Sequence, residues 1–330
     1  MAFKIAFIAL DNCLGSSITG PMDLFTAANT IARLANKADP VFEWEIVSED
    51  GEPVNTFNGY PQAVDQSWNE LGKVDLIIIP GIGLEATEAL PDMINKNQSL
   101  VQWLKQQAKT GVQVAGNCSG NFLMAEAGLL NGHPATTAWW VTDFFQDRYP
   151  EVSLQADAIL TATDQFICSG SATSSMDMGI YLIERLAGQT LAKQVARYML
   201  VDVNRNTQAA YRLPQPQNSQ DPQISKATRF IRRNLKKEIS VQGLAEEMHV
   251  STRTLIRKFI QQTGSPPLAF IQKLRIETGK ELLENSSLPL DEIVFQIGYQ
   301  DSSSFRRLFK RETGLSPREY RKQFTISPVS

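Results

Sequence analysis

The sequence is poor in the side chains that hold metals or cross-link small domains. Its 330 residues include two histidines, His133 and His249, and three cysteines, Cys13, Cys118 and Cys168. The cysteines are odd in number, far apart, and outside any Cys-x-x-Cys or Cys/His cluster. A disulfide framework needs paired cysteines and a zinc site needs clustered ligands, so we expect neither, and no cofactor.

Long apolar runs are also missing. No uninterrupted stretch approaches the roughly 18 apolar residues that a membrane span requires. The apolar segment Phe3–Leu10 contains Lys4 and is closed by Asp11, and no small-residue cleavage site follows it. It therefore predicts a buried strand rather than a signal peptide. We expect a cytoplasmic protein with no membrane partner.

Charge is divided unequally along the chain, although the net charge is only −3. Residues 221–330 contain 19 lysines and arginines against 12 aspartates and glutamates, while residues 1–220 contain 13 against 23. An acidic body joined to a basic C-terminal part indicates that only the latter meets a polyanion. An excess of basic residues also fits an ordinary solvated surface. A sequence motif is therefore needed to identify a DNA-binding domain.

A polar segment with three prolines separates two parts of different composition and predicts a linker over residues 213–222. Before it, short apolar segments alternate with amphipathic ones; after it, only short helical patterns occur. This alternation predicts an α/β domain over residues 1–212, a flavodoxin-like parallel sheet between helices, and an all-α domain over residues 223–330. The expected strands are Phe3–Leu10, Phe42–Ser48, Leu76–Ile79 and Val112–Ala115, and the clearest helices are Pro21–Leu34 and Ser99–Lys109.

The C-terminal part contains the same helical unit twice. Leu255-Ile-Arg-Lys-Phe259 aligns with Phe305-Arg-Arg-Leu-Phe309 at an offset of 50 residues, and upstream the offset is 49, which indicates one extra residue in the second turn. Each copy predicts a helix-turn-helix, and together they predict a double helix-turn-helix domain. The expected turn and cap residues are His249, Val250 and Ser251 in the first copy, and Gly298 with Asp301 or Ser302 in the second.

The second helix of each copy has an apolar side and a polar side. Leu255 and Phe259 are four residues apart, as are Phe305 and Phe309, and all four are expected in the core. The remaining sides carry basic and hydroxyl side chains, which hold phosphates or read base edges, so double-stranded DNA is the expected partner. The candidate DNA-binding residues are Arg253, Thr254, Arg257, Lys258, Ser303, Ser304, Arg306, Arg307 and Lys310.

Residues 222–325 resemble the DNA-binding domain of the AraC/XylS family. The resemblance is carried most strongly by Gly298-Tyr299, by the run from Phe305 to Gly314, and by Ser316-Pro-Arg-Glu-Tyr-Arg321. It implies that a long helix, here Leu268–Leu283, holds the two units. It also implies that both recognition helices enter successive major-groove segments, about 34 Å apart on one DNA face. RNA polymerase is a further candidate partner.

A nucleophile-elbow pattern lies in the front part. The strand expected at Val112–Ala115 leads into Gly116-Asn-Cys-Ser-Gly120, and an apolar helix is expected at Asn121–Ala127. A strand, a tight turn and a helix, with glycines two before and two after the central residue, is the G-x-S-x-G geometry with Cys118 at its centre. The N-terminus of the following helix is expected to favour a thiolate. The alternative is an inert cysteine buried at a strand end.

Residues 3–187 resemble the PfpI-like branch of the class I glutamine amidotransferase-like superfamily. The resemblance is carried by Gly20-Pro21, by Ile77–Gly81, by the elbow at Cys118 and by Ala125–Gly132. Catalytic relatives place a histidine beside the cysteine, commonly in Thr-Thr-His-Trp in PfpI-like regulators, where this chain has Thr136-Thr-Ala-Trp139. The resemblance therefore implies a pocket without a catalytic base. Its expected ligand-binding residues are Cys118, Ser119, Gly81, Ala138 and Trp139.

Three weaker patterns accompany the elbow. Gly81-Ile-Gly83 departs from the glycine pair of the family, which argues against a conventional oxyanion hole. The small polar segment 169–175 would either offer backbone N–H groups to an anion or cap a helix expected at Met176–Leu186. Five aromatic side chains would form either a cation-binding cage or ordinary core, and their spacing favours core: Trp68, Trp139, Trp140, Phe144 and Phe145.

Nearly the whole chain resembles the GlxA-like branch of AraC-type regulators. The resemblance implies a transcriptional regulator that is not an enzyme and that responds to a small-molecule effector, often an amino acid or a quaternary amine. It also implies a homodimer formed through the front domain. Two alternatives remain open at this point: a cysteine-dependent hydrolase or glyoxalase-like enzyme that uses Cys118, and a thiol redox sensor.

Overall fold

The computed structural model describes residues 2–35, 39–203, 205, 207–212 and 221–325. The chain divides into two compact units, Met1–Gln208 and Ala209–Ser330, which are described separately. Residues 209–212, expected at the end of the front domain, thus belong to the second unit; residues 213–220 of the expected linker lie outside the described residues. Among the helices of the described ranges, none combines the length and the apolar character needed to cross a membrane.

A seven-stranded sheet, in the order β10-β11-β7-β6-β1-β2-β5, forms the centre of the first unit. All neighbouring pairs are parallel except β10 and β11. Two further pairs, β3 with β4 and β8 with β9, lie outside this sheet. The strands are β1 (Phe3–Ile8), β2 (Phe42–Ser48), β3 (Val54–Asn55), β4 (Pro61–Gln62), β5 (Gln66–Ser67), β6 (Leu76–Ile79), β7 (Gln113–Asn117), β8 (Pro134–Ala135), β9 (Ser153–Leu154), β10 (Leu160–Ala162) and β11 (Phe166–Ser169).

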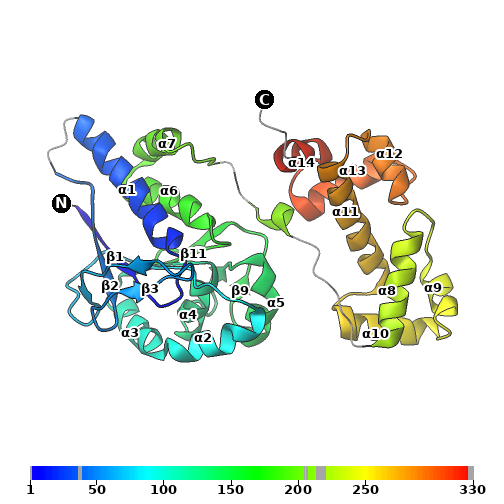
Figure 1. Ribbon diagram of the computed structural model, residues 1–330, viewed down its shortest axis with the longest axis horizontal. Coiled ribbons are helices and arrows are strands. Elements are labelled where there is room, and N and C mark those ends of the chain that lie inside the picture. Colours follow the sequence, from blue (N-terminus) through cyan, green and yellow to red (C-terminus); the bar gives the residue numbers. More distant parts are fainter. Residues whose placement is uncertain (1, 36–38, 204, 206, 213–220, 326–330) are drawn as a thin grey trace. The chain divides into compact units, whose positions relative to one another are not determined.

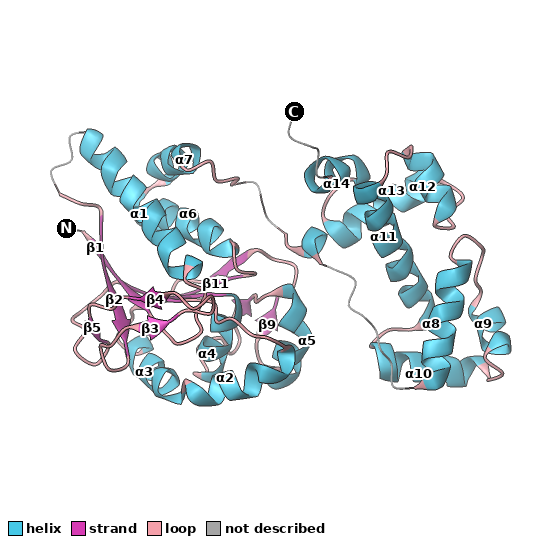
Figure 2. Ribbon diagram, viewed as in Figure 1, coloured by secondary structure: helices cyan, strands magenta, loops and turns pink. Residues whose placement is uncertain are grey.

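Helices cover both faces of this sheet, which confirms the flavodoxin-like sandwich (Figures 1 and 2). One face is covered by α1 (Ser16–Leu34), α6 (Ser174–Ala187) and α7 (Gln189–Tyr198), and the other by α2 (Leu90–Lys96), α3 (Gln98–Ala108), α4 (Asn121–Glu126) and α5 (Thr142–Arg148). Because both faces are covered, β6 is buried at every residue, as a continuous apolar run predicts.

Helix α1 begins five residues earlier than its sequence pattern indicates. The start predicted at Pro21 is wrong, because the Gly15 carbonyl already accepts from the backbone N–H groups of Ile18 and Thr19. Proline fixes only its own φ and removes only its own donor, so the first turn can close ahead of it. Gly20 sits in that turn, where a Cβ would come within 2.9 Å of the Met176 sulfur on α6.

The described part of the second unit is entirely helical. Its helices are α8 (Pro222–Asn234), α9 (Val241–Glu247), α10 (Thr252–Thr263), α11 (Pro267–Asn285), α12 (Leu290–Gln296), α13 (Ser302–Thr313) and α14 (Pro317–Phe324). The side chain of Asp221 accepts from the Gln223 N–H and caps α8, with Pro222 in its first turn. The linker expected over 213–222 therefore includes the N-cap and the first residue of a helix.

Two small cores lie along α11, one for each helix-turn-helix. Leu255 and Phe259 are buried in the first core, and Phe305 and Phe309 in the second, as their spacing predicts. Helix α11 supplies side chains to both cores, so the long connecting helix implied by the family resemblance is present. The guanidinium group of Arg275, on α11, donates to the carbonyl oxygen of Lys237 at 2.9 Å and lies over the ring of Tyr299.

Candidate functional site

Cys118 occupies a strained turn between β7 and α4. Its φ is +55°, in the left-handed region that non-glycine residues seldom adopt, as a nucleophile elbow requires. The flanking glycines allow neighbouring groups to pack closely against the turn. A Cβ at Gly116 would lie 2.2 Å from the Asn121 amide oxygen, and one at Gly120 would lie 2.3 Å from the Pro80 carbonyl oxygen. The elbow geometry predicted from the glycine spacing is therefore present.

The loop after β6 closes against this elbow. The Ser119 hydroxyl accepts from the Ile82 N–H at 2.7 Å and donates to the Ile82 carbonyl oxygen at 2.6 Å. A Cβ at Gly81 would lie 3.0 Å from the Cys118 Cβ. The structure thus brings three of the expected pocket residues, Gly81, Cys118 and Ser119, into one cluster at the carboxyl ends of parallel strands, where α/β sheets bind ligands.

Asn117 connects this cluster to α1 and to the end of β11. Its amide oxygen accepts from the Ser17 hydroxyl at 2.9 Å, and its amide nitrogen donates to the Ser169 hydroxyl at 2.9 Å. All three side chains are fully buried. They are polar groups that fix the floor of the site, and the sequence did not single out Asn117 or Ser17 for this role.

The thiol of Cys118 is not activated. The expectation of a thiolate is wrong, because burial raises the pKa of Cys118 to about 11 and outweighs the hydrogen bonds from Ser119 that lower it. The side chain is only 2% exposed, and α4 has six residues, so the dipole of this short helix is weak. Burial likewise raises the pKa of Cys13, and that of Cys168 to about 12. All three are free, buried cysteines. A redox sensor needs an accessible, reactive thiol, so these cysteines do not support the redox-sensor alternative.

Neither histidine stands in for the missing base. Ala138, at the position of the family histidine, is fully buried beside the elbow, where the Thr137 hydroxyl donates to the Cys118 carbonyl oxygen at 2.9 Å. The ring of His133 packs on Phe166, which pairs with Val114 at the start of β7, three residues before the end that carries the elbow. His249 lies in the second unit.

The aromatic residues mostly form core, as their spacing favours. Trp68 packs on Trp103 with ring centroids 6.0 Å apart, and Phe145 packs on Phe122 at 4.9 Å. Phe144 also contacts the Phe122 ring. The exceptions are Trp139 and Trp140, which meet edge to face at 5.5 Å and remain half-buried and 38% exposed, respectively.

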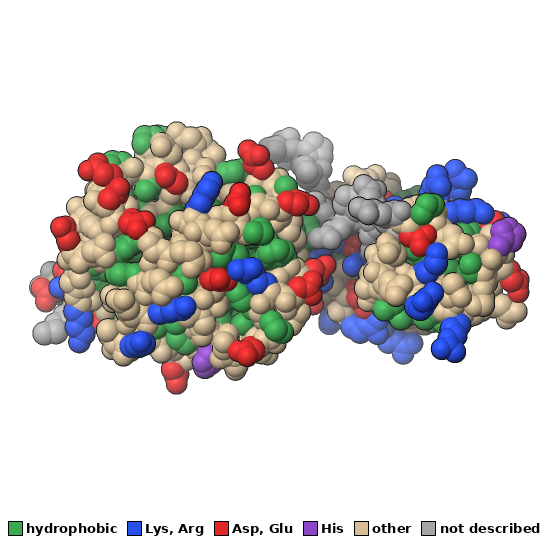
Figure 3. All heavy atoms as spheres, turned by 90° about the horizontal axis from the view of Figure 1, so that it is seen from below, with side chains coloured by type: hydrophobic (Ala, Val, Ile, Leu, Met, Phe, Trp, Pro, Cys, Tyr) green, Lys and Arg blue, Asp and Glu red, His purple; other side chains and the backbone are tan. Residues whose placement is uncertain are grey.

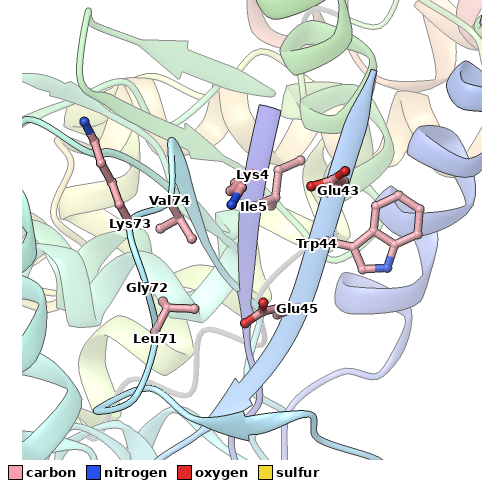
Figure 4. Close-up of a pocket in the computed structure, with 9 residues that line it drawn as sticks. All are labelled: Lys4, Ile5, Glu43, Trp44, Glu45, Leu71, Gly72, Lys73 and Val74. Atoms are coloured by element: carbon pink, nitrogen blue, oxygen red, sulfur yellow. The ribbon is translucent and has the colours of Figure 1, made fainter. Parts of the chain in front are cut away.

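A small hollow at the opposite end of the sheet is separate from the elbow. It lies beside the start of β1 and β2, where Lys4 pairs with Glu43, and Figure 4 shows Trp44 pointing away from Glu43 and Glu45. Its volume of about 140 Å³ is below the range of about 300–1,000 Å³ that ligand pockets occupy. It is therefore too small for an effector site.

The turns of the two helix-turn-helix units share a residue with positive φ and a side-chain cap. The connection from α9 to α10 has four residues and that from α12 to α13 has five, as the change of offset predicts. His249 and Gly298 take the same place in the two turns, with φ of +55° and +85°. The predicted caps are also present: the side chain of Ser251 accepts from the Thr254 N–H, and that of Asp301 accepts from the Ser304 N–H.

The candidate DNA-binding residues fall into two groups. Seven lie on the open side of α10 or α13 or at its start: Arg253, Arg257, Ser303, Arg306, Arg307 and Lys310 are exposed, and Ser304 is half-buried. The others are engaged within the unit. The ammonium group of Lys258 lies 3.0 Å from the Asp221 carboxylate and donates to Gln223 at 2.6 Å, and the Thr254 hydroxyl shares a hydrogen bond with Ser251. Sequence spacing alone did not reveal these partners. Figure 3 shows basic side chains gathered over the second unit and acidic ones scattered over the first.

Gln208 contacts the segment beside the elbow, and the sequence did not indicate this contact. It is buried at the end of the first unit, and its amide nitrogen donates to the carbonyl oxygens of Thr137 at 2.7 Å and Ala156 at 3.0 Å. Gly170 leaves room for it, because a Cβ there would lie 2.9 Å from the Gln208 amide oxygen. An isolated glutamine in a polar stretch gives no sequence signal for such a role.

Comparisons with known proteins identify both units. The model of the DJ-1/PfpI family matches residues 4–185, and a helix-turn-helix domain model matches residues 244–323. The transcriptional regulator CdhR of Pseudomonas aeruginosa is 29% identical over 311 residues, covering 93% of this chain and 89% of the relative. The regulator GbdR of the same species is 25% identical over 321 residues, covering 96% and 84%.

Solved structures resemble the first unit in fold. A ThiJ/PfpI family protein from Pseudomonas syringae aligns with a TM-score of 0.52 and 16% identity, covering 71% of this chain and 87% of that one. Drosophila melanogaster DJ-1beta aligns with a TM-score of 0.51 and 18% identity, covering 61% and 100%. The chain belongs to the DJ-1/PfpI family and joins this domain to an AraC-type helix-turn-helix domain, the architecture of a transcriptional regulator.

Proposed function

We propose that the chain regulates transcription by binding operator DNA through α10 and α13 under the control of a small molecule held beside Cys118. The observation that carries this proposal is the joining of two helix-turn-helix units to a nucleophile elbow whose base position is the buried Ala138. Without a base at this position, a ligand held beside Cys118 is not turned over, which is what a sensor needs.

Three features of the elbow argue against catalysis. The Cys118 thiol stays protonated near neutral pH, because burial raises its pKa to about 11. Ala138 has no group that accepts its proton. The Ile82 N–H, which follows the glycine at the mouth of the elbow, is already hydrogen-bonded to Ser119 and is not free to stabilise an oxyanion.

A route from the pocket to the second unit runs through Gln208. The Cys118 carbonyl oxygen accepts from the Thr137 hydroxyl, and the Thr137 carbonyl oxygen accepts from the Gln208 amide. Gln208 is the last residue of the first unit, and the chain passes directly into Ala209 of the second. A ligand that shifts the Thr137 segment changes the anchoring of this connection, and differential binding to the two arrangements supplies the signal.

The remaining assignments follow from the same architecture. The effector contacts are assigned to Gly81, Cys118, Ser119, Ala138 and Trp139, and the effector class to amino acids or amines, in line with the regulator resemblance. The protein acts in the cytoplasm as a homodimer formed through the first unit, with RNA polymerase as a partner at promoters. None of these steps requires a cofactor.

The test is a screen of amino acids and amines against the full chain by thermal shift, followed by DNA binding with and without each hit. We expect a hit to raise the Tm and to change DNA affinity, and Cys118→Ser to shift the concentration required. Cys168→Ser is the matched control, because it alters a buried thiol on β11 outside the elbow turn. Turnover of a hit that is lost in Cys118→Ala would contradict the proposal and support the enzyme alternative.

A further inference from the structure

The two recognition helices differ at equivalent exposed positions. At the 50-residue offset, Ile256 of α10 corresponds to Arg306 of α13, and Ile260 corresponds to Lys310. Ile256 is 36% exposed and Ile260 is 48% exposed, and both basic counterparts are exposed as well. The duplicated unit therefore presents an apolar pair in one copy where it presents two cations in the other.

The apolar pair lies on the side of α10 that faces away from the protein. Leu255 and Phe259 point into the core, and with 3.6 residues per turn the opposite side carries Arg253, Arg257 and Ile260. Ile256 adjoins this side one turn before Ile260. The residues of this stripe line a shallow, open hollow: Arg253, Thr254, Ile256, Arg257, Ile260 and Gln261.

The charges that flank the isoleucines indicate what covers them. Arg253 and Arg257 have no carboxylate partner within salt-bridge distance among the described residues, and both are exposed. An apolar protein surface would have to bury these two guanidinium groups without compensation. Duplex DNA instead satisfies them with phosphates or guanine edges while its major groove takes up the residues between them.

The major groove offers one apolar group to such side chains, the 5-methyl group of thymine. We infer, on the basis of the proposed function, that Ile256 and Ile260 select thymine in the operator segment under α10. The equivalent cations on α13, Arg306 and Lys310, contact phosphates or guanine instead. One protein chain thus recognises two DNA segments of different sequence. The DNA site of one chain has no internal repeat, even though the DNA-binding domain contains two copies of the helix-turn-helix.

Replacing thymine by uracil tests this inference directly, because it removes only the methyl group and leaves base pairing intact. A preferred duplex is first selected from random DNA with the full chain, and then each thymine is replaced singly by uracil. We expect loss of affinity at one or two positions in one half of the site, by about fourfold for each methyl group that contacts an isoleucine.

The Ile256→Ala/Ile260→Ala variant should bind the thymine duplex more weakly and no longer distinguish it from the uracil duplex. Arg306→Ala/Lys310→Ala, the matched variant in the second copy, should weaken binding and keep the full thymine-to-uracil ratio. Equal affinity for all the uracil duplexes, or a ratio that survives the isoleucine substitutions, would overturn the inference. Failure to select any sequence would instead contradict the proposed function, so the two failures are distinguishable.

Discussion

The side-chain amide of Gln208 donates to the carbonyl oxygen of Thr137, 2.7 Å away, and so fixes the segment that carries position 138. The same amide donates to the Ala156 carbonyl oxygen at 3.0 Å, and the Gln208 side chain is buried. A buried carbonyl that loses its donor costs free energy, so these hydrogen bonds favour one arrangement of the Thr137 segment. The end of the first unit is thereby tied to the segment that lies beside the Cys118 elbow.

Gln208→Ala should lower the free energy of unfolding of the full chain by about 1–3 kcal/mol, because it removes the donor to the carbonyl oxygen of buried Thr137 and to that of half-buried Ala156. It should also alter the DNA response to effector, measured by promoter-reporter titration. Gln165→Ala is the matched control, because Gln165 serves the carbonyls of Ala108 and Val112, away from position 138. A comparable loss of stability with unchanged response in both variants would remove Gln208 from the signalling route.

The second prediction concerns alkaline pH. Burial raises the pKa of Cys118 from 9.0 to about 11, so the folded thiol keeps its proton where the unfolded one loses it. The resulting stabilisation is complete below about pH 9 and is lost as the pH rises through 11. The free energy of unfolding should fall by about 2–3 kcal/mol over this range on account of Cys118. Denaturant titrations between pH 8 and 11.5 measure it, and Cys118→Ser should show a fall smaller by that amount; identical profiles would contradict the pKa shift.

The sequence predicted those features that depend on local pattern. Apolar β-branched runs located the strands at Phe42–Ser48 and Leu76–Ile79 to the residue, and the spacing of glycines located the elbow at Cys118. The repeat revealed both helix-turn-helix units, because the same buried positions recur in each copy. Each of these patterns can be recognised without knowing which distant residues come into contact.

Features that depend on distant contacts were missed. The sequence predicted Lys258 as a DNA-binding cation, but its partner Asp221 is 37 residues away and is brought near by the packing of α8 on α10. Gln208 meets Thr137 across 71 residues. The thiolate expectation failed for a related reason, since complete burial of Cys118 is a property of the whole fold and outweighs the local helix terminus.

The third prediction compares two glycines of the second unit. Gly298 has a φ of +85°, and a Cβ there would lie 2.1 Å from the Leu235 carbonyl oxygen. Gly264 has a φ of +69° with nothing within 4 Å of a Cβ. Gly264→Ala should cost about 1–2 kcal/mol from backbone strain alone, and Gly298→Ala should cost clearly more, because the backbone of Leu235 must also move. Chemical denaturation of the two variants of the full chain makes the comparison, and equal losses would mean that the turn at Gly298 relaxes freely.

The last prediction separates the basic residues of α10 by function. Arg257 is exposed on the open side, so Arg257→Ala should weaken operator binding about 5- to 150-fold if the guanidinium reads a base, equivalent to about 1–3 kcal/mol. Lys258, one residue on, is held by Asp221 and Gln223, so Lys258→Ala should leave affinity nearly unchanged and slightly loosen the start of α8. Each variant removes one positive charge from the same helix, which controls for long-range electrostatics. Fluorescence anisotropy with labelled operator at several salt concentrations gives both affinity and its salt dependence. If the two variants lost affinity equally, general charge rather than the orientation of α10 would determine binding, and α10 would not be a reading helix.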